Sequence, residues 1–377
     1  MSLVIDFHAL QSLPPSNVNR DDTGAPKSAI FGGVPRQRVS SQSWKRAMRQ
    51  VFEKELGQEQ VGYRTKRVAG LVADRVVALT EERGEKWDTS KAVEAAEDLF
   101  KTAGFSMTTP KVKEGEDARS SETGYLMFLS DHQVRAAAEH LISHDGEKLQ
   151  KNDVKPLLDT AHSIDIAMFG RMVADDPTYN VDASVQVAHA IGIHGSAPEF
   201  DYFTAVDDVV EDAEETGAGM IGTVQMMSST LYRYATVDVE SLVANLGDRA
   251  VATSAIGAFV RAFITSLPSG KQNTFAANTL PELVYVTVRD GRPISLVNAF
   301  EVAIKSEDGT GRRQEGAARM AAEDRGIREA YGFTPLAAFV MGIGDLAEPF
   351  DDLAEKVSLP ELVEKVTDAL DPAGDRQ

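Results

Sequence analysis

The sequence contains no cysteine, which excludes a disulfide scaffold, a cysteine-ligated metal or iron–sulfur site and a thiol nucleophile. It also lacks an apolar run of the ~20 residues that a membrane-spanning helix needs, because Arg261 interrupts the best candidate, Ala255–Leu267. The first ten residues have no basic region and carry Asp6 inside their apolar stretch, unlike a signal peptide. We therefore expect a cytoplasmic protein. No Walker loop and no G-x-S-x-G elbow occurs, and we expect no cofactor.

Basic residues are outnumbered: 39 lysines and arginines face 58 aspartates and glutamates, which gives a net charge of −19. A surface of that sign repels phosphate and argues against an unselective nucleic-acid coat. The charge is segregated, however. The segment 36–49 carries basic residues and no acid, whereas 199–215 and 345–377 are strongly acidic. One basic face on an acidic protein can bind an anion, and a solvated helix face without a partner explains the pattern equally well.

The apolar fraction of 42% over 377 residues is enough for two or three packed domains, at about 150 residues each. Apolar spacing predicts an α+β fold with a large helical insertion after its first unit. The predicted strands are 3–10, one or two within 223–239, and 283–288; the predicted helices begin at Ser40 or Ser41, fill most of 63–166, cover 249–267 and form an acidic tail from Pro335. The segment 181–193 fits a strand or a helix, and 108–124 reads as a polar loop.

The first predicted helix carries the most informative pattern. Gln42, Lys45 and Arg49 share one side of it, while its apolar residues occupy another side. Basic and hydroxyl side chains precede them: Arg36, Arg38, Ser40 and Ser41. Free N–H groups at a helix start, a hydroxyl and several cations on one face suit a phosphodiester backbone. Nucleic-acid binding and an ordinary capped amphipathic helix account for these residues equally well.

Three further patterns indicate structure more than chemistry. Gly217–Gly222 match G-x-G-x-x-G, but no strand precedes and no helix follows, so we predict a glycine-rich hairpin or loop end. His140 and His144 have metal-compatible spacing without an evident third ligand, so we predict no metal site. The Asp21–Asp22 pair is more typical of a turn than of a catalytic centre.

Two short segments offer side chains that suit unstacked bases. Tyr202 and Phe203 lie in an acidic stretch predicted as a loop, where exposed aromatic rings can stack on bases. Met172 follows Arg171, and an apolar wedge beside an arginine can separate a pair of stacked bases. Each segment also fits a plain structural role, as the anchor of a long loop or as a piece of the core.

Longer blocks of the sequence resemble a known family. They comprise 19–22, Lys27, 29–33, 38–43 and 45–49, followed by 165–167, 170–172, 202–208, 232–235, 270–272 and 298–300. In this order they resemble the CasC family, the backbone subunits of type I-E CRISPR surveillance complexes (Cascade), within the Cas seven family and the RAMP superfamily. The stretch 65–163 matches only in helical character, and the residues after Phe300 hardly match.

The resemblance implies a right-hand shape with a modified RRM or ferredoxin-like palm, a helical fingers insertion and a thumb β-hairpin. The expected segments are palm 1–60, fingers 61–168, palm 169–194, thumb 195–223 and a last palm segment with acidic C-terminal helices, 224–377. About six copies would polymerise as a filament along one CRISPR RNA and hold it in kinked segments for pairing with target DNA in antiviral defence. Large, small, guide-processing and cap subunits would be further partners.

The resemblance also implies roles for individual residues. The expected RNA-binding residues are Arg20, Lys27, Arg38, Ser40, Gln42, Lys45, Arg46, Arg49, Arg171, Met172, Lys271 and Gln272. Tyr202 and Phe203 would displace or stack on a base of the RNA. The family implies no catalytic residue, because a separate helicase-nuclease cuts the DNA. The alternative is a metal-dependent ribonuclease of the same superfamily that uses Asp21 or Asp22.

Overall fold

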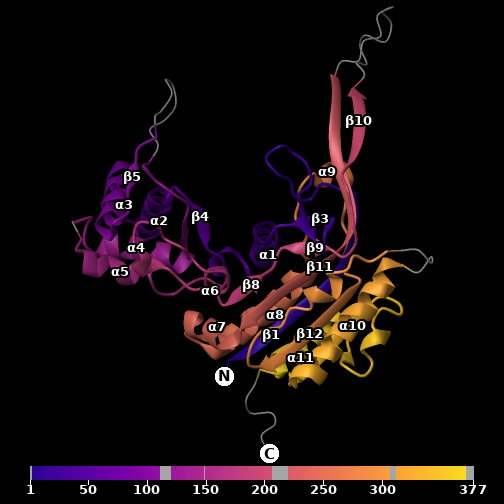
Figure 1. Cartoon of the computed structure of the whole chain (residues 1–377). Helices are drawn as coiled ribbons and strands as arrows, with labels where there is room; N and C mark the ends of the chain where they lie inside the picture. Colours follow the sequence, from indigo (N-terminus) through magenta and orange to yellow (C-terminus); the bar gives the residue numbers. More distant parts are fainter. Residues whose placement is uncertain (1, 111–119, 148, 206–219, 306–310, 371–377) are drawn as a thin grey trace, which may run out of the picture. The chain divides into compact units, whose positions relative to one another are not determined.

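The structure is a computed structural model that describes residues 2–110, 120–147, 149–205, 220–305 and 311–370 (Figure 1). The chain forms two compact units. The sheet unit comprises Met1–Met48, Gln186–Val237 and Phe259–Gln377, and the helical unit comprises Arg49–Val185 and Asp238–Ala258. The predicted α+β class is confirmed, and each unit is interrupted in sequence by the other.

A mixed sheet forms the centre of the sheet unit, with strand order β14-β13-β12-β1-β11-β9-β3-β2. The strands on this path are β1 (Leu3–Ser16), β2 (Ser28–Phe31), β3 (Val34–Val39), β9 (Ala190–Gly192), β11 (Met220–Asp238), β12 (Leu283–Asp290), β13 (Ala337–Gly342) and β14 (Glu355–Lys356). Two more strands, β8 (Val185–Val187) and β10 (Glu199–Ala205), pair with β11 off this path. Strands β2 and β3 therefore end the sheet at one edge, and β14 ends it at the other.

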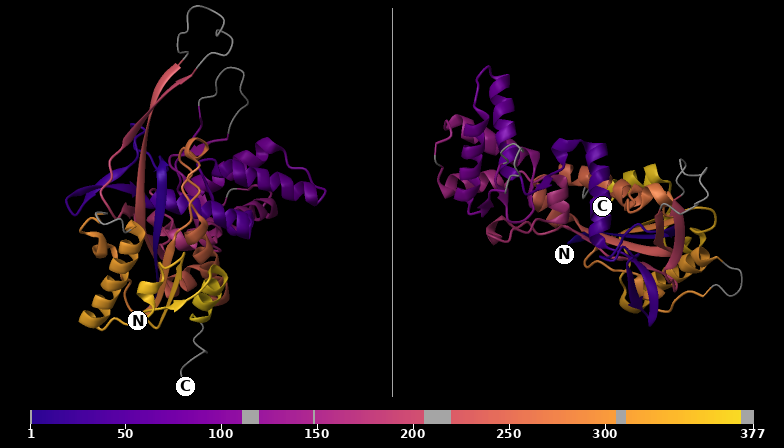
Figure 2. Two further views of the ribbon diagram at one scale, coloured as in Figure 1. Left: turned by 90° about the vertical axis from the view of Figure 1, so that its right-hand side faces the viewer. Right: turned by 90° about the horizontal axis from the view of Figure 1, so that it is seen from above.

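Strands β1 and β12 are buried on both faces along most of their length; β12 is nearly continuously apolar, whereas β1 also buries polar side chains such as Asp6 and His8. On one face, Leu10, Tyr232 and Tyr285 pack against Met320 of α10 (Arg312–Tyr331). On the other face, Phe7 contacts Phe259 and Phe263 of α8 (Arg249–Thr265), with ring centroids 5.2 and 5.6 Å apart. Helix α11 (Leu359–Asp368) packs against β13, and its yellow ribbon is the last helix before the C-terminus in Figure 2. Helices thus cover both faces of the sheet.

Strand β1 pairs with β12 only from Leu3 to Leu10, in antiparallel register from Asp290 to Leu283. The strand itself continues to Ser16, so the prediction that it ends near Leu10 was wrong. Beyond Leu10, its backbone takes other partners on the β12 side: the Ser12 N–H donates to the Glu282 carboxylate at 2.9 Å. Pro14, which faces the same side of the strand as Ser12, has no N–H and is tolerated there because no strand pairing continues beyond Leu10 on that side.

The C-terminal region differs from the predicted run of helices. Ala337–Gly342 form β13, an apolar strand antiparallel to β12, and within the described residues the one α-helix after it is 359–368. Two ambiguities are also resolved: 181–193 contains the short strands β8 and β9, and 223–239 is spanned by the single long strand β11.

The helical unit confirms the predicted helical character of 63–166. Its helices are α2 (Val68–Glu82), α3 (Thr89–Ala103), α4 (Asp131–Ser143), α5 (Lys151–Leu158), α6 (Ile164–Phe169) and α7 (Val239–Leu246). Val72, Val76, Leu99, Phe100 and Leu141 are among the residues of its core. Two small sheets, β4 (Tyr63–Thr65) with β7 (Met127–Leu129) and β5 (Met107–Thr108) with β6 (Glu122–Thr123), connect the helices.

Short helical turns complete the elements: η1 (Gln58–Gln60), η2 (Pro177–Tyr179), α9 (Gln272–Phe275), η3 (Val297–Phe300) and η4 (Glu348–Phe350). Much of the polar loop predicted at 108–124 lies outside the described residues. Within the described stretches of the chain, no helix has the length and apolar character needed to cross a membrane.

Candidate nucleic-acid interface

Helix α1 (Ser41–Leu56) begins next to the edge strand β3, as its sequence predicts. The Ser40 hydroxyl accepts from the Ser43 N–H at 3.4 Å, and the Ser40 N–H donates to the Asn19 side chain at 2.8 Å. Asn19 in turn accepts the Lys27 N–H through its carbonyl oxygen at 3.0 Å. Hydrogen bonds of Ser40 and Asn19 therefore connect the helix start to the 19–27 loop.

The apolar side of α1 is fixed to the sheet through an arginine. Arg233 of β11 is buried, and its guanidinium lies 3.7 Å from the Trp44 ring centroid and 4.6 Å from that of Phe263. It donates to the Gln11 side chain at 2.7 Å and to the Phe263 carbonyl oxygen. A buried cation held between two rings and two oxygens gives the helix one orientation on the sheet.

Cationic side chains meet at this edge of the sheet. Arg38 of β3 donates from Nη1 to Nδ1 of His189 at 3.0 Å, and its backbone N–H donates to the Lys27 carbonyl oxygen at 2.9 Å. Arg20 lies in the same loop, in a bridge to Pro26. We call Arg20, Lys27, Arg38 and His189 the basic edge. Among the residues that the structure describes, no carboxylate forms an ion pair with these four, so the charges of Arg20, Lys27 and Arg38 are available to an anion.

The turn that carries Lys271 and Gln272 also meets this loop. Gly270 packs so closely that an added Cβ would lie 2.4 Å from the carbonyl oxygen of Val18. Lys271 has a positive φ of 50°, which is uncommon for lysine and starts α9. The close approach places Lys271 and Gln272 beside the residues that precede Arg20. The structure thus brings together predicted RNA-binding residues from positions 20–40 and 271–272.

On α1 itself, the residues of the predicted basic side differ in how exposed they are. Gln42 and Arg46 are exposed. Lys45 is partly buried, and desolvation lowers the pKa of its ammonium group. Arg49 donates from Nε to Asp165 at 2.7 Å and from Nη2 to the Gly62 carbonyl oxygen at 3.0 Å. Since Asp165 is fully buried, this ion pair gives Arg49 a structural role within the helical unit that its spacing on the helix did not predict.

The neighbouring residues Arg171 and Met172 point to opposite environments. Arg171 is buried, donates to the carbonyl oxygens of Tyr179 and Phe128 at 2.9 and 3.3 Å, and pairs with Asp159 at 3.2 Å. These protein groups occupy its guanidinium, so its predicted contact with RNA does not follow from the structure. Met172 is 83% exposed, which fits the wedge that the resemblance implies. Arg171 therefore anchors the segment from which Met172 projects.

The predicted thumb is an antiparallel hairpin of β10 and β11, in register from Glu199↔Met226 to Ala205↔Met220 (Figure 1). Alternation along β10 separates the two predicted aromatics. Phe203 lies over Gly222 of β11, where an added Cβ would come within 2.4 Å of its ring, and it is 38% exposed. Tyr202 is 64% exposed, and Phe200, two residues before it, is 68% exposed.

Phe200 was missed by the sequence analysis because 199–215 was read as an acidic loop. Strand periodicity over Glu199–Ala205 could have found it, since residues 200 and 202 share a face of any strand. Of the G-x-G-x-x-G pattern, Gly217–Gly219 lie outside the described residues, and Met220–Gly222 begin β11.

The other candidate groups have local structural roles. One Asp21 carboxylate oxygen accepts the N–H groups of Thr23 and Ala25 and the Thr23 hydroxyl, which lower the pKa of Asp21, the hydroxyl most. Asp21 therefore shapes a turn. The rings of His140 and His144 lie 4.1 Å apart on α4. Within the described ranges, no group of three potential ligands is arranged to hold a metal ion.

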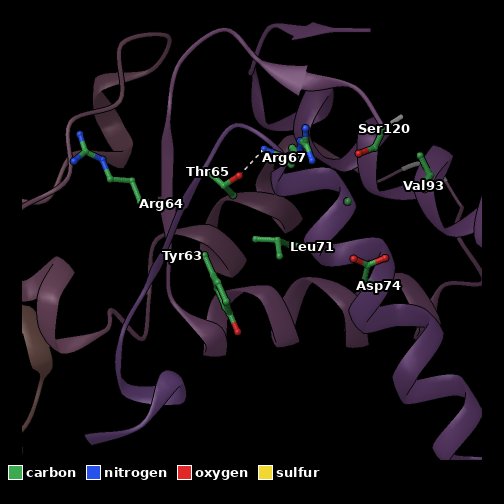
Figure 3. A pocket seen from close by; sticks show the side chains of 9 residues that line it. Tyr63, Arg64, Thr65, Arg67, Leu71, Asp74, Val93 and Ser120 are labelled. Atoms are coloured by element: carbon green, nitrogen blue, oxygen red, sulfur yellow. Dashed lines mark hydrogen bonds between the residues drawn. The ribbon is translucent and has the colours of Figure 1, made fainter. Parts of the chain in front are cut away.

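A pocket of about 490 Å³ lies in the helical unit, beside β4 and α2 (Figure 3). Tyr63, Thr65 and Leu71 line it, together with Arg67, which pairs with Glu122 at 3.1 Å. Thr65 accepts the Arg67 N–H at 3.0 Å (Figure 3). None of the residues proposed to bind RNA lines this pocket.

The fold thus defines an α+β protein whose sheet has a cationic edge and a long hairpin with exposed aromatic side chains. The family of CT1975-like proteins matches residues 5–365, and the chain belongs to this family. It is 35% identical to a chain of a solved "CRISPR RNA-guided surveillance complex, pre-nicking", with a TM-score of 0.82 over 97% of this chain and 99% of that one. It is 30% identical to a chain of another "CRISPR RNA-guided surveillance complex", with a TM-score of 0.73 and the same coverage. Curated proteins give no match.

Proposed function

We propose that this chain is a guide-RNA-binding backbone subunit of a CRISPR surveillance complex of the Cascade type, and specifically of type I-E. Copies of the chain polymerise along one CRISPR RNA, hold it in kinked segments for pairing with target DNA, and contact the large, small, guide-processing and cap subunits. The observation that carries the proposal is the basic edge, where Arg20, Lys27 and Arg38 lie together without an acidic partner among the described residues. Full-length similarity to two surveillance-complex chains supports it.

The geometry of the site suits a protein that accepts any guide sequence. Arginine and lysine side chains and the N–H groups of a helix start bind phosphates, which carry no sequence information. The exposed rings of Phe200 and Tyr202 and the exposed Met172 contact bases through stacking or wedging, which every base tolerates. The surrounding acidic surface confines RNA to the basic edge.

The experiment compares RNA binding by the full chain and by Lys27→Glu/Arg38→Glu. Single-stranded RNA of guide length is titrated at several salt concentrations. We expect the double variant to bind at least tenfold more weakly, and the slope of log affinity against log salt to fall by roughly 0.7 per lost phosphate contact. Copurification of a guide-length RNA from cells that express the chain with a CRISPR array and its partner subunits provides a second readout.

The matched control is Lys356→Glu/Lys365→Glu, which makes the same charge change on the same unit. Lys356 lies in β14, at the opposite edge of the sheet from β3, and both lysines form exposed ion pairs, with Asp351 and Glu355. Equal losses in the two double variants would assign the effect to net charge and contradict the proposed site. A wild-type chain that binds no RNA, alone or with its partners, would contradict the proposed function.

We also propose that the subunit is not itself a nuclease. The turn bonds of Asp21 occupy one of its carboxylate oxygens, which favours the structural reading of the Asp21–Asp22 pair. Bound target RNA should stay intact with Mg²⁺ or Mn²⁺. Divalent-ion-dependent cleavage at regular spacing, lost in Asp22→Ala, would establish the ribonuclease instead.

A further inference from the structure

His189 occupies a position in the basic edge that its sequence context did not reveal. It lies in the two-residue link between β8 and β9, is exposed, and has its Nδ1 3.0 Å from Nη1 of Arg38. A guanidinium has only donors, so Nδ1 accepts this hydrogen bond. In this arrangement the ring is neutral, with its proton on Nε2.

The charged groups that face His189 from the neighbouring elements are both cations. They are Arg38 of β3, whose Nε also lies 3.5 Å from the Ser28 carbonyl oxygen, and Lys27, which precedes β2. Desolvation contributes most to lowering the pKa of His189, and these two cations lower it further. Within the described residues, no carboxylate offsets them at this site.

We propose that His189 is a phosphate-binding residue of the basic edge and that a proton is taken up there when a phosphodiester of RNA binds beside Arg38. This inference rests on the proposed function, since RNA supplies the phosphate. The phosphate charge offsets both cations and favours the imidazolium form. The protonated ring no longer accepts from Arg38, and both side chains then donate to phosphate oxygens. The proton comes from the solvent and forms one new N–H bond at Nδ1, and no other covalent bond changes.

The linkage has a definite sign. Free His189 has a lowered pKa, and bound His189 has a higher one, so the complex holds more protons than the free chain between these two values. RNA affinity therefore rises as the pH falls through the bound-state pKa and becomes constant below the free-state pKa. If the bound-state and free-state pKa values differ by one unit, the RNA affinity at low pH exceeds that at high pH by at most tenfold.

The test measures affinity for a single-stranded RNA between pH 5.5 and 8 at fixed salt, for the full chain and His189→Gln. Glutamine can still accept from Arg38 but does not titrate. We expect about threefold to tenfold tighter binding by wild type at the acidic end, and no pH dependence for His189→Gln. Calorimetry in two buffers of different ionisation enthalpy should detect proton uptake by wild type only. His132→Gln, an exposed histidine of α4 in the helical unit, is the matched control and should behave as wild type.

The outcomes separate this inference from the function on which it rests. RNA binding that is equally pH-dependent in wild type and His189→Gln, or pH-independent in wild type, overturns the role of His189 and leaves the proposed function standing. Absence of RNA binding at every pH, by the chain alone and with its partners, overturns both. Unchanged thermal unfolding of His189→Gln verifies that the substitution acts at the site.

Discussion

At the scale of single residues, the structure separates arginines that can bind an anion from arginines that hold the fold. Arg49 and Arg171 bind a buried carboxylate or carbonyl oxygens, whereas Arg20 and Arg38 lie at the basic edge without an acidic partner among the described residues. Spacing along α1 could not reveal this difference, because Asp165 lies 116 residues from Arg49 in sequence. The sequence thus predicted the cationic helix start but not which of its charges are occupied.

Asp165 provides a prediction at this scale. Its carboxylate accepts from Arg49, from the Gly62 N–H at 2.9 Å and from the Ser163 hydroxyl at 2.7 Å, and it is fully buried. Asp165→Ala leaves Arg49 without its partner and should lower the free energy of unfolding by about 3–5 kcal/mol. Urea denaturation followed by circular dichroism measures this loss. Asp182→Ala, at an exposed carboxylate, is the control, and equal midpoints for the two variants would contradict the role of Asp165.

At the scale of elements, the helices and strands that could be predicted from the sequence are those with a strong apolar pattern. Helices α1 and α8 and strands β1 and β12 have long buried stretches, and their positions were predicted. Helix α10 was not, because it packs through small residues such as Gly316, Ala317 and Ala321 between charged ones, which leaves a weak periodicity. Strand β13 was mistaken for helix because its six residues are fixed as a strand by pairing with β12, for example Ala337 with Val288, and this partner is distant in sequence.

The hairpin of β10 and β11 gives the prediction that belongs to this scale. Phe200 and Tyr202 share the exposed face, so Phe200→Ala and Tyr202→Ala should each weaken RNA binding by about 1–3 kcal/mol through lost stacking. Phe203→Ala should affect RNA affinity less, because that ring covers Gly222 within the hairpin. Fluorescence-detected RNA titrations rank the three variants. A larger loss for Phe203→Ala than for Phe200→Ala would show that the opposite face contacts RNA.

At the scale of the whole molecule, the separation of charge predicts where RNA does not bind. Exposed acids without an ion-pair partner in the described C-terminal region include Asp345, Glu348, Glu364 and Asp368. Their replacement by lysine should create a second, unselective phosphate-binding surface. We expect the Lys27→Glu/Arg38→Glu defect to be partly masked in this background, and the salt dependence to steepen. Replacement of the same four acids by Asn or Gln is the control, and RNA binding unchanged by the lysines would contradict a confining role of the acidic surface.

Strand β1 extends beyond the end of its pairing with β12, and this extension bears on aggregation. A strand with unpaired backbone N–H and C=O groups along one side can pair with a strand of another chain, which is a common route to aggregation. The pairing of β1 with β12 ends at Leu10, and on that side Glu282 accepts the N–H of Ser12, while Pro14, two residues further on and facing the same side, has no N–H. This stretch of β1 therefore offers few backbone donors to a second chain, which makes it a poor template for pairing between strands of different molecules.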